Sequence, residues 1–317
     1  MDDLSKVRVG FFGTPIFALR ILKALNSSFA NIKYVVTQAP KRAGRGKSIK
    51  FSEVHQWSNL KGLKVFSPIN TKDPDFINSI LAIDVDFLVV AAFGHLISEE
   101  ILNHPKHMSV NVHASLLPRW RGAAPIQRSI LNGDKETGIS IMRVDKKLDS
   151  GPVIIKEKTS IESNDSSGLL HDKLSEIGSK LIIQAIKEIY LGNHKLHFQD
   201  EDSVTYAKKI DKKETKIVWN NTADYNQRFI RAFNPWPGAW TNIRQRKKLR
   251  VKILESEVVP DKNSSNHNEE PGFCSDQLVV KCKENSLKII TIQKEGKKIM
   301  TANEFLNGNT FRSCFLE

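Results

Sequence analysis

A strand that turns directly into a helix decides the fold, and it reads Val7-Arg8-Val9-Gly10-Phe11-Phe12-Gly13-Thr14-Pro15. Valine and phenylalanine dominate residues 7–12, which predicts a strand buried on both faces. Gly13 supplies the tight turn, and Pro15, with its fixed φ, suits the first turn of a helix. A strand followed at once by a helix is the first half of a βαβ unit, the element of parallel sheets.

This alternation continues through the first 160 residues. Further strands are predicted at 32–36, 63–66, 87–93, 109–113, 138–144 and 152–161, with helices at 15–25, 52–60, 75–81 and 123–131. A longer amphipathic helix follows over residues 166–190, because its apolar residues recur at helical spacing. The pattern predicts an α/β protein with a Rossmann-like, doubly wound and mostly parallel sheet.

The predicted sheet lacks the motifs of common nucleotide-binding proteins. The turn at Gly13 contains no G-x-G-x-x-G, and the second strand ends in Val35-Val36-Thr37-Gln38, with no acid to bind a ribose. A phosphate-binding G-x-x-x-x-G-K-S/T loop is also missing from the sequence. These observations argue against NAD-linked oxidoreduction and P-loop chemistry.

The pattern changes after residue 190. Residues 191–206 are polar and have no clear period, which predicts a linker. One helix at 223–233 then precedes short strands, predicted at 239–243, 249–254, 277–282, 287–292 and 298–300, with a loop at 260–272. Short strands that are separated by turn residues favour a small β-barrel. The predicted domains are therefore 1–190 and 207–317, joined by the linker 191–206.

Composition excludes several classes of protein. A chain of 317 residues is long enough for about two domains. The three cysteines have no zinc spacing, which argues against a disulfide scaffold or a zinc module. The acidic start resembles neither a signal nor a transit sequence, and the longest apolar run, residues 87–93, is too short for a membrane span. We therefore expect a protein of the bacterial cytoplasm.

The charge of the chain points to a class of partner. The net charge is +13, and residues 207–317 hold 21 basic side chains against 13 acidic ones. A basic surplus favours polyanionic partners through long-range attraction and counterion release. A solvated basic surface is the alternative, and charge alone leaves both open.

The segment richest in chemical groups is residues 109–127. Asn111 and His113 are two apart on a predicted strand, so their side chains point to one face at its C-terminal end, where open α/β sheets place their sites. An amide donor beside an imidazole suits a reaction that develops charge on a carbonyl oxygen. Asp145 or Asp149 could orient the imidazole. No serine or cysteine is placed as a nucleophile, which predicts direct attack by a substrate amine, although each residue alone could equally be structural.

The same segment carries a resemblance to a known family. Its core, Asn-Val-His-Ala-Ser-Leu-Leu-Pro-Arg-Trp-Arg-Gly-Ala-Ala-Pro from Asn111 onward, resembles the signature of formyltransferases that use 10-formyltetrahydrofolate, above all the branch that acts on methionyl-tRNA. Further matches are Phe12-Gly13-Thr14-Pro15-Ile16-Phe17-Ala18, Thr37-Gln38 with Ala43-Gly44-Arg45-Gly46-Lys47, Leu148-Asp149-Ser150-Gly151 and Ile230-Arg231-Ala232-Phe233-Asn234-Pro235-Trp236-Pro237. The resemblance extends from about residue 7 to about residue 306.

The resemblance implies a Rossmann-like catalytic domain, an OB-like C-terminal barrel, and formyl transfer from 10-formyltetrahydrofolate to the α-amino group of methionyl initiator tRNA. The family's catalytic residues fall on Asn111, His113 and Asp149, which leaves Asp145 as a residue near the folate. The implied folate site comprises Ala92, Phe93, Gly94, His95, Leu96, Ser115, Leu116, Leu117, Pro118, Asp145 and Gly151. No metal and no membrane are implied, and we expect a monomer.

Two basic segments are the implied tRNA contacts. In the loop at 40–47, glycines allow close backbone approach and cations neutralise phosphate. The second segment is 206–252, with 13 basic side chains against three acidic ones. The implied contacts are Lys41, Arg42, Arg45, Lys47, Lys208, Lys209, Arg244, Arg246, Lys247 and Lys248. Trp236 and Trp240 could stack bases, although the prolines beside Trp236 favour a structural role.

Two other functions compete with this one. A formyltransferase acting on a nucleotide-linked amino sugar, or on another small amine, would use the same three catalytic residues but would need neither basic segment. A catalytically inactive RNA-binding protein would need the basic segments but not the three catalytic residues. The presence of both features favours the tRNA substrate.

Overall fold

A computed structural model describes residues 4–43, 48–244, 248–264, 268–308 and 311–317. The chain divides into two compact units. The first consists of Met1–Pro125, Glu136–Ser160 and His171–Lys208, and the second of Ile126–Lys135, Ile161–Leu170 and Lys209–Glu317. The domain boundaries predicted from the sequence remain a prediction.

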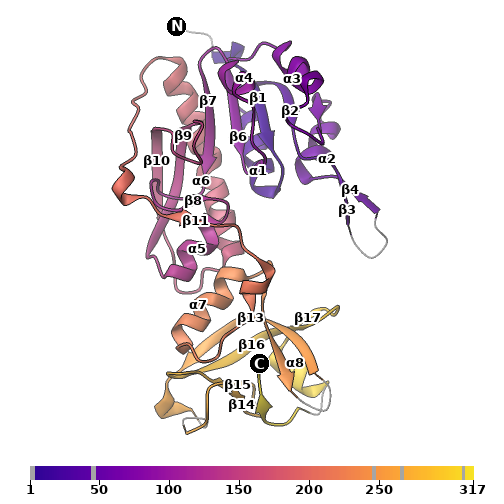
Figure 1. The fold of residues 1–317 in the computed structure, drawn as a ribbon, viewed down its shortest axis with the longest axis vertical. Coiled ribbons are helices and arrows are strands. Elements are labelled where there is room, and N and C mark those ends of the chain that lie inside the picture. Colours follow the sequence, from indigo (N-terminus) through magenta and orange to yellow (C-terminus); the bar gives the residue numbers. More distant parts are fainter. Residues whose placement is uncertain (1–3, 44–47, 245–247, 265–267, 309–310) are drawn as a thin grey trace. The chain divides into compact units, whose positions relative to one another are not determined.

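The first unit is built on a sheet that has, in the described ranges, seven strands in the order β10-β9-β7-β6-β1-β2-β5 (Figure 1). The neighbours from β5 to β7 pair in parallel, and β9 and β10 are added antiparallel. The strands are β1 Arg8–Gly13, β2 Asn31–Val36, β5 Val65–Phe66, β6 Phe87–Ala91, β7 Met108–His113, β9 Glu136–Arg143 and β10 Val153–Ser160. The predicted Rossmann-like, mostly parallel sheet is confirmed.

Helices pack against this sheet (Figure 1). Ser52 and Asp73 cap two of them, since each side chain accepts a hydrogen bond from a backbone N–H of the first turn. The helices are α1 Ile16–Asn26, α2 Glu53–Leu60, α3 Pro74–Leu81, α4 Glu99–Asn103 and α6 Ser167–Tyr190, the last shared with the second unit. Of the helices in the described ranges, none is long and apolar enough to cross a membrane.

The strand order reverses at β1: the chain adds β2 on one side of β1 and later adds β6 on the other side. Ligands of open α/β sheets bind at such a switch point, beyond the carboxyl ends of the strands. Gly13 ends β1 there and pairs with Ala91 of β6. A Cβ on Gly13 would lie 2.9 Å from the Ala91 carbonyl oxygen and 2.5 Å from the Cβ of Ala18. Only glycine therefore allows β1, β6 and α1 to meet so closely.

Two small sheets complete the described part of the first unit. The hairpin strands β3 Lys41–Ala43 and β4 Ser48–Lys50 pair antiparallel, and β8 Arg121–Gly122 pairs in parallel with β11 Tyr206–Ala207. The segment predicted as a linker leads into β11, contains the short 3-10 helix η2 Glu201–Ser203, and forms a bridge from His197 to Val153. This polar segment therefore makes ordered contacts with other strands of the first unit.

The second unit is a barrel-like antiparallel sheet in the order β12-β13-β16-β15-β14-β18, with β17 added on β16 (Figure 1). Its strands are β12 Ala239–Arg244, β13 Lys248–Val259, β14 Phe273–Cys274, β15 Val279–Lys281, β16 Ser286–Lys294, β17 Ile299–Thr301 and β18 Cys314–Phe315. Its helices are α5 Pro125–Asn132, whose first residue belongs to the first unit, α7 Ala223–Phe233 and α8 Ala302–Asn307. A further 3-10 helix, η3 Lys212–Thr215, precedes the barrel.

The barrel is nearly closed by residues that follow β18. Leu316 forms a bridge with Ile243 of β12, and Asn242 and Glu317 exchange backbone hydrogen bonds of 2.8 and 2.9 Å. The interior is filled by a cluster that includes Phe233, Ile253 and Phe305. The predicted small β-barrel is confirmed, with strands β14 and β18 added to those the sequence predicted.

Candidate active site

Strand β7 ends in the two polar residues that the sequence singled out. Asn111 is the register partner of Val90 on β6 and of Met142 on β9, which places it inside the sheet near its carboxyl edge. His113 is 5% exposed, so its imidazole is buried among its partners rather than solvated. The period of two along the strand puts both side chains on one face, as predicted.

Asp149 reaches these two residues from the loop between β9 and β10. Its backbone has a φ of 48°, in the left-handed region that aspartate tolerates better than most residues. Its Oδ1 lies 3.4 Å from the Asn111 Nδ2, and its Oδ2 lies 3.6 Å from the His113 Nδ1 and accepts a 2.8 Å hydrogen bond from the backbone N–H of Gly122. The structure therefore brings Asn111, His113 and Asp149 together.

The imidazole of His113 is held by a hydrogen bond at one nitrogen and faces a carboxylate with the other. Its Nε2 lies 2.9 Å from the carbonyl oxygen of Trp120. Because a carbonyl oxygen only accepts hydrogen bonds, Nε2 must carry a proton. The proton that His113 can gain or lose is then on Nδ1, the nitrogen that faces Asp149. The site thus holds one titratable nitrogen beside a carboxylate.

The loop from β7 to β8 is held by its own hydrogen bonds. Ser115 donates from Oγ to the carbonyl of Arg119, and Ser140 links the Ser115 carbonyl to the backbone N–H of Leu117. Ser115 and Leu117 are buried, whereas Leu116 and Pro118 are partly exposed. Of the predicted folate residues in this loop, Ser115 and Leu117 therefore shape the loop, whereas Leu116 and Pro118 are partly accessible to solvent.

The predicted folate segment after β6 leaves the sheet at the switch point. Ala92 and Gly94 have positive φ values of 45° and 79°, so the backbone turns sharply on either side of the buried Phe93. The Phe93 carbonyl accepts hydrogen bonds from the Gln38 amide at 2.8 Å and from the Thr14 hydroxyl at 3.4 Å. Ala92, Gly94, His95 and Leu96 are exposed. The segment therefore presents an exposed, backbone-rich surface near Asn111.

The other two predicted folate residues differ in their surroundings. Asp145 is exposed, and its carboxylate lies 3.6 Å from the Arg143 guanidinium. Gly151 is buried, and a Cβ there would lie 1.9 Å from the Arg143 carbonyl oxygen. Gly151 is therefore required for the path of the loop that carries Asp149.

The trio can perform acyl-group chemistry without a covalent enzyme intermediate. An amide nitrogen has two protons, so Asn111 can contact Asp149 with one and donate the other to a substrate oxygen. His113 can supply or remove a proton at Nδ1 beside the Asp149 carboxylate. Within the described residues, no group of three or more histidine, cysteine or acidic side chains is placed to hold a metal ion.

The predicted tRNA contacts are divided between the two units. Lys41 is exposed and donates to the Gln38 side chain at 3.0 Å, and Arg42 contributes its backbone to β3. Lys208, Lys209, Arg244 and Lys248 are exposed, and the last two pair with the carboxylate of Glu317. Arg45, Lys47, Arg246 and Lys247 lie outside the described residues.

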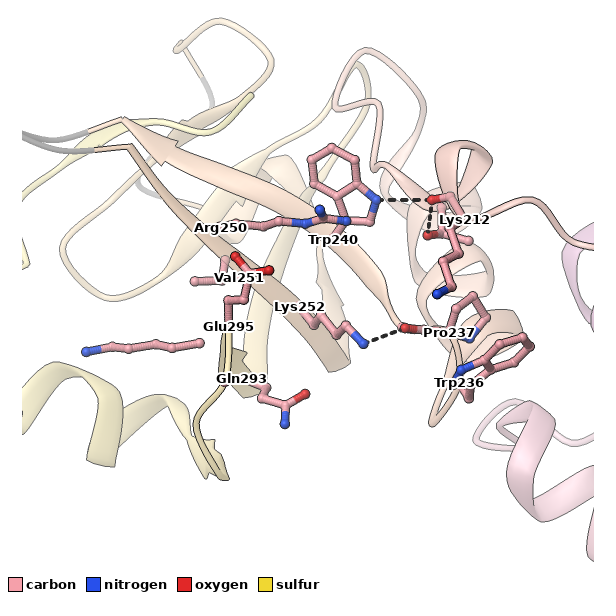
Figure 2. Close-up of a pocket in the computed structure, with 13 residues that line it drawn as sticks. Lys212, Trp236, Pro237, Trp240, Arg250, Val251, Lys252, Gln293 and Glu295 are labelled. Atoms are coloured by element: carbon pink, nitrogen blue, oxygen red, sulfur yellow. Dashed lines mark hydrogen bonds between the residues drawn. The ribbon is translucent and has the colours of Figure 1, made fainter. Parts of the chain in front are cut away.

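A basic, aromatic pocket of about 400 Å³ opens on the barrel (Figure 2). The Arg250 guanidinium lies 3.9 Å from the centre of the Trp240 ring, and Lys252 donates to the Pro237 carbonyl at 2.6 Å. Lys212, beside the pocket, is exposed, and its carbonyl accepts from the Trp240 indole at 3.5 Å. Trp236 is 62% exposed. Cations and exposed indole surface are the groups that bind single-stranded nucleic acid.

Sequence reasoning assigned no role to several residues that contact the trio. Gly122 donates to Asp149 through its backbone, and Trp120 accepts from His113 through its carbonyl. Gln199 donates to the Asp149 carbonyl across 50 residues of chain. Contacts through backbone atoms or over such separations leave no local pattern in a sequence.

Comparisons with known proteins place this fold and site in a class. Residues 6–186 match the family described as formyl transferase, and residues 209–310 match the formyl transferase C-terminal domain. The methionyl-tRNA formyltransferase of Caulobacter vibrioides is 40% identical over 303 residues, which cover 95% of this chain and 97% of that protein. The chain belongs to the methionyl-tRNA formyltransferase family.

Solved structures share the fold at low identity. HypX from Aquifex aeolicus, solved with tetrahydrofolic acid, is 12% identical with a TM-score of 0.65, over 94% of this chain and 46% of HypX, so the chain spans about half of HypX. An N-formyltransferase from Helicobacter canadensis, solved with folinic acid and dTDP-3-aminofucose, is 18% identical with a TM-score of 0.62. It is matched over 91% of this chain and 99% of its own length.

Proposed function

We propose that this protein transfers the formyl group of 10-formyltetrahydrofolate to the α-amino group of methionyl initiator tRNA. The product is formylmethionyl-tRNA for translation initiation. The observation that carries the proposal is the nearly full-length likeness to a methionyl-tRNA formyltransferase, in a chain whose Asn111, His113 and Asp149 lie together. The reaction takes place in the cytoplasm, on a monomeric enzyme without a metal.

The chemistry follows from the trio. The α-amino group has a reference pKa of about 8, so part of it is neutral and nucleophilic at physiological pH. When it attacks the formyl carbon, negative charge develops on the formyl oxygen, and Asn111 and protonated His113 stabilise that charge. The amine then loses a proton while N10 of the departing folate gains one. Protonated His113 donates its Nδ1 proton to N10, and the amine proton returns to Nδ1 through a water molecule, while the Asp149 carboxylate orients the ring.

The predicted folate residues fit the formyl donor. The surface formed by Ala92, Gly94, His95 and Leu96 follows β6 at the switch point, where backbone groups are accessible to a planar ring. Leu116, Pro118 and Asp145 add partly exposed side chains from two neighbouring loops. Ser115, Leu117 and Gly151 act on the donor indirectly, through the shape of those loops.

The acceptor substrate accounts for the charge of the chain. Lys41 in the first basic segment, and Lys208, Lys209, Arg244 and Lys248 in the second, are exposed cations that neutralise tRNA phosphates. Arg42, Arg45, Lys47, Arg246 and Lys247 belong to the same proposed contacts. The pocket with Trp236, Trp240 and Arg250 offers stacking surface on the barrel.

The proposal is tested by offering several acceptors to the same protein. With labelled 10-formyltetrahydrofolate, we expect label in charged methionyl initiator tRNA and none in free methionine or in an amino-sugar nucleotide. Formylation of the amino sugar instead would keep the trio and overturn the tRNA substrate. Salt-sensitive tRNA binding without any turnover would favour the inactive RNA-binding protein.

Removal of one pocket cation is expected to weaken tRNA binding electrostatically. Lys212→Ala should reduce the slope of log binding constant against log salt concentration by about one unit, because one phosphate contact is lost. Filter binding or fluorescence anisotropy at several salt concentrations measures that slope. Lys180→Ala, an exposed lysine on α6, is the matched control and should keep the parental slope. Equal slopes for both variants would remove Lys212 from the tRNA surface.

A further inference from the structure

We propose that residues 199–205, inside the segment that the sequence predicts as a linker, position the active site. In this inference Gln199 and Thr205 are positioning residues that set the loops of Asp149 and of Trp120. The inference rests on the proposed function, since it concerns the same reaction. It extends the site from the trio to a segment that arrives from another part of the chain and contains the 3-10 helix η2.

Gln199 holds the loop that carries Asp149. Its side-chain nitrogen donates to the Asp149 carbonyl at 2.8 Å and to the Gly151 carbonyl at 2.7 Å. Its side-chain oxygen accepts from the Arg121 Nε at 3.0 Å. Both amide protons and one oxygen lone pair are thus used, and an amide is the one neutral side chain of this length that can donate twice and accept once. The Gln199 amide therefore fixes the turn around Asp149.

Arg121 connects Gln199 to a second member of the segment. Its side chain is buried, with the whole residue 2% exposed, and its guanidinium makes two contacts with Glu201 at 2.8 and 3.4 Å. The hydrogen bond from Arg121 lowers the pKa of the Glu201 carboxyl below its usual value. A buried guanidinium requires partners of this kind. Arg121 is therefore ordered only while residues 199–201 lie against it.

Thr205 holds the other loop. Its hydroxyl accepts from the Trp120 backbone N–H at 2.9 Å, and its carbonyl accepts from the Arg121 backbone N–H at 2.9 Å. Trp120 has a φ of 62°, which a bulky residue adopts only when its surroundings impose it. The carbonyl of the same residue accepts from the His113 Nε2. Thr205 therefore affects the position of the His113 imidazole through the backbone of Trp120.

The two loops meet at the catalytic carboxylate. The pairing of β8 with β11 aligns Gly122 with Ala207, and the Gly122 N–H donates to Asp149 Oδ2. A Cβ on Gly122 would lie 2.7 Å from the Ala207 carbonyl oxygen, so the two strands approach as closely as glycine allows. Displacing the segment would therefore move the Asp149 carboxylate and the His113 ring relative to each other.

The test uses Gln199→Met, which keeps the length of the side chain and removes all three hydrogen bonds. We expect kcat to fall roughly 10- to 100-fold, as for a small misplacement of catalytic groups. The KM values for both substrates should change less than threefold. The two expected changes are thus a lower kcat and nearly parental KM values, which is the pattern of misplaced catalytic groups with intact substrate binding.

Two further variants make the result specific. Thr205→Val removes the acceptor for the Trp120 N–H, keeps the branched shape, and should produce the same two changes even where Gln199→Met folds poorly. Gln184→Met, on the exposed face of α6, loses a 2.8 Å hydrogen bond to Glu188 and should keep the parental kcat and KM values. Thermal unfolding of each variant reports whether the fold is intact.

The outcomes separate this inference from the proposed function. An inactive parent protein would overturn the proposed function. An active parent, with kcat unchanged in Gln199→Met and Thr205→Val, would overturn the positioning role alone. A lower kcat that only follows a lowered unfolding temperature would also overturn it, because a merely structural role predicts that pattern.

Discussion

Asp149→Asn is expected to lower kcat for methionyl-tRNA formylation on the order of 10³-fold. The substitution removes the negative charge that lies 3.6 Å from the His113 Nδ1, so the imidazolium loses its partner. An asparagine oxygen can still accept from the Gly122 N–H, but the amide nitrogen then faces the Asn111 amide, and two donors oppose each other. The chemical step should therefore lose both the ion-pair partner of the imidazole and the orientation of Asn111.

The fold should survive this substitution. Asparagine tolerates a φ near 48° as well as aspartate does, so the loop keeps its path. Single-turnover rates with saturating folate and charged tRNA measure the effect, and tRNA binding should be unchanged. Asp84→Asn is the matched control, because Asp84 lies before β6, at the opposite edge of the sheet, and its carboxylate pairs with Arg8. A near-parental rate for Asp149→Asn would remove this carboxylate from the mechanism.

Asn111→Ala is expected to cost about 10²- to 10³-fold in kcat, the usual effect of deleting one donor to a developing oxyanion. The donor acts on charge that appears only in the transition state, so the KM values should remain close to those of the parent. The strand should be preserved, because the backbone pairing of residue 111 with β6 and β9 does not involve the side chain.

Steady-state kinetics with each substrate varied in turn distinguish this role from simple binding. A raised KM with an unchanged kcat would mean that Asn111 binds substrate uniformly and does not stabilise the oxyanion. Asn59→Ala provides the control, since Asn59 is exposed on α2 in the same unit. Its rate and KM values should equal those of the parent protein.

The sequence predicted the elements whose pattern is local. The apolar runs of β1, β6 and β7 and the turn at Gly13 define the parallel sheet, and the two-residue spacing of Asn111 and His113 places them on one face. Each depends only on side-chain period or on one turn. These patterns can be recognised in a single sequence because the same kind of contact, an apolar side chain against the core, recurs along the whole strand.

The parts that the sequence left open depend on distant contacts. Strands β8, β11, β14 and β18 have two residues each, too few to display a period. Asp145 and Asp149 lie in one loop, and the residues alone left open which of them approaches His113; the resemblance selected Asp149, and the structure places its Oδ2 3.6 Å from the His113 Nδ1. In residues 191–206, which the sequence predicts as a linker, the polar Gln199 contacts a partner far away in the chain, Arg121, and no local pattern announces this contact.

The hydrogen bond from His113 to the Trp120 carbonyl has a consequence for sequence variation. Every amino acid carries a carbonyl, so the ring's tautomer does not depend on the chemistry of the side chain at position 120. It depends on whether that residue can hold a φ near 62°, which glycine and asparagine do more readily than tryptophan. Substitutions at position 120 are therefore limited by the backbone conformation that the residue must adopt. The indole side chain can be replaced while the proton on the His113 Nε2 stays in place.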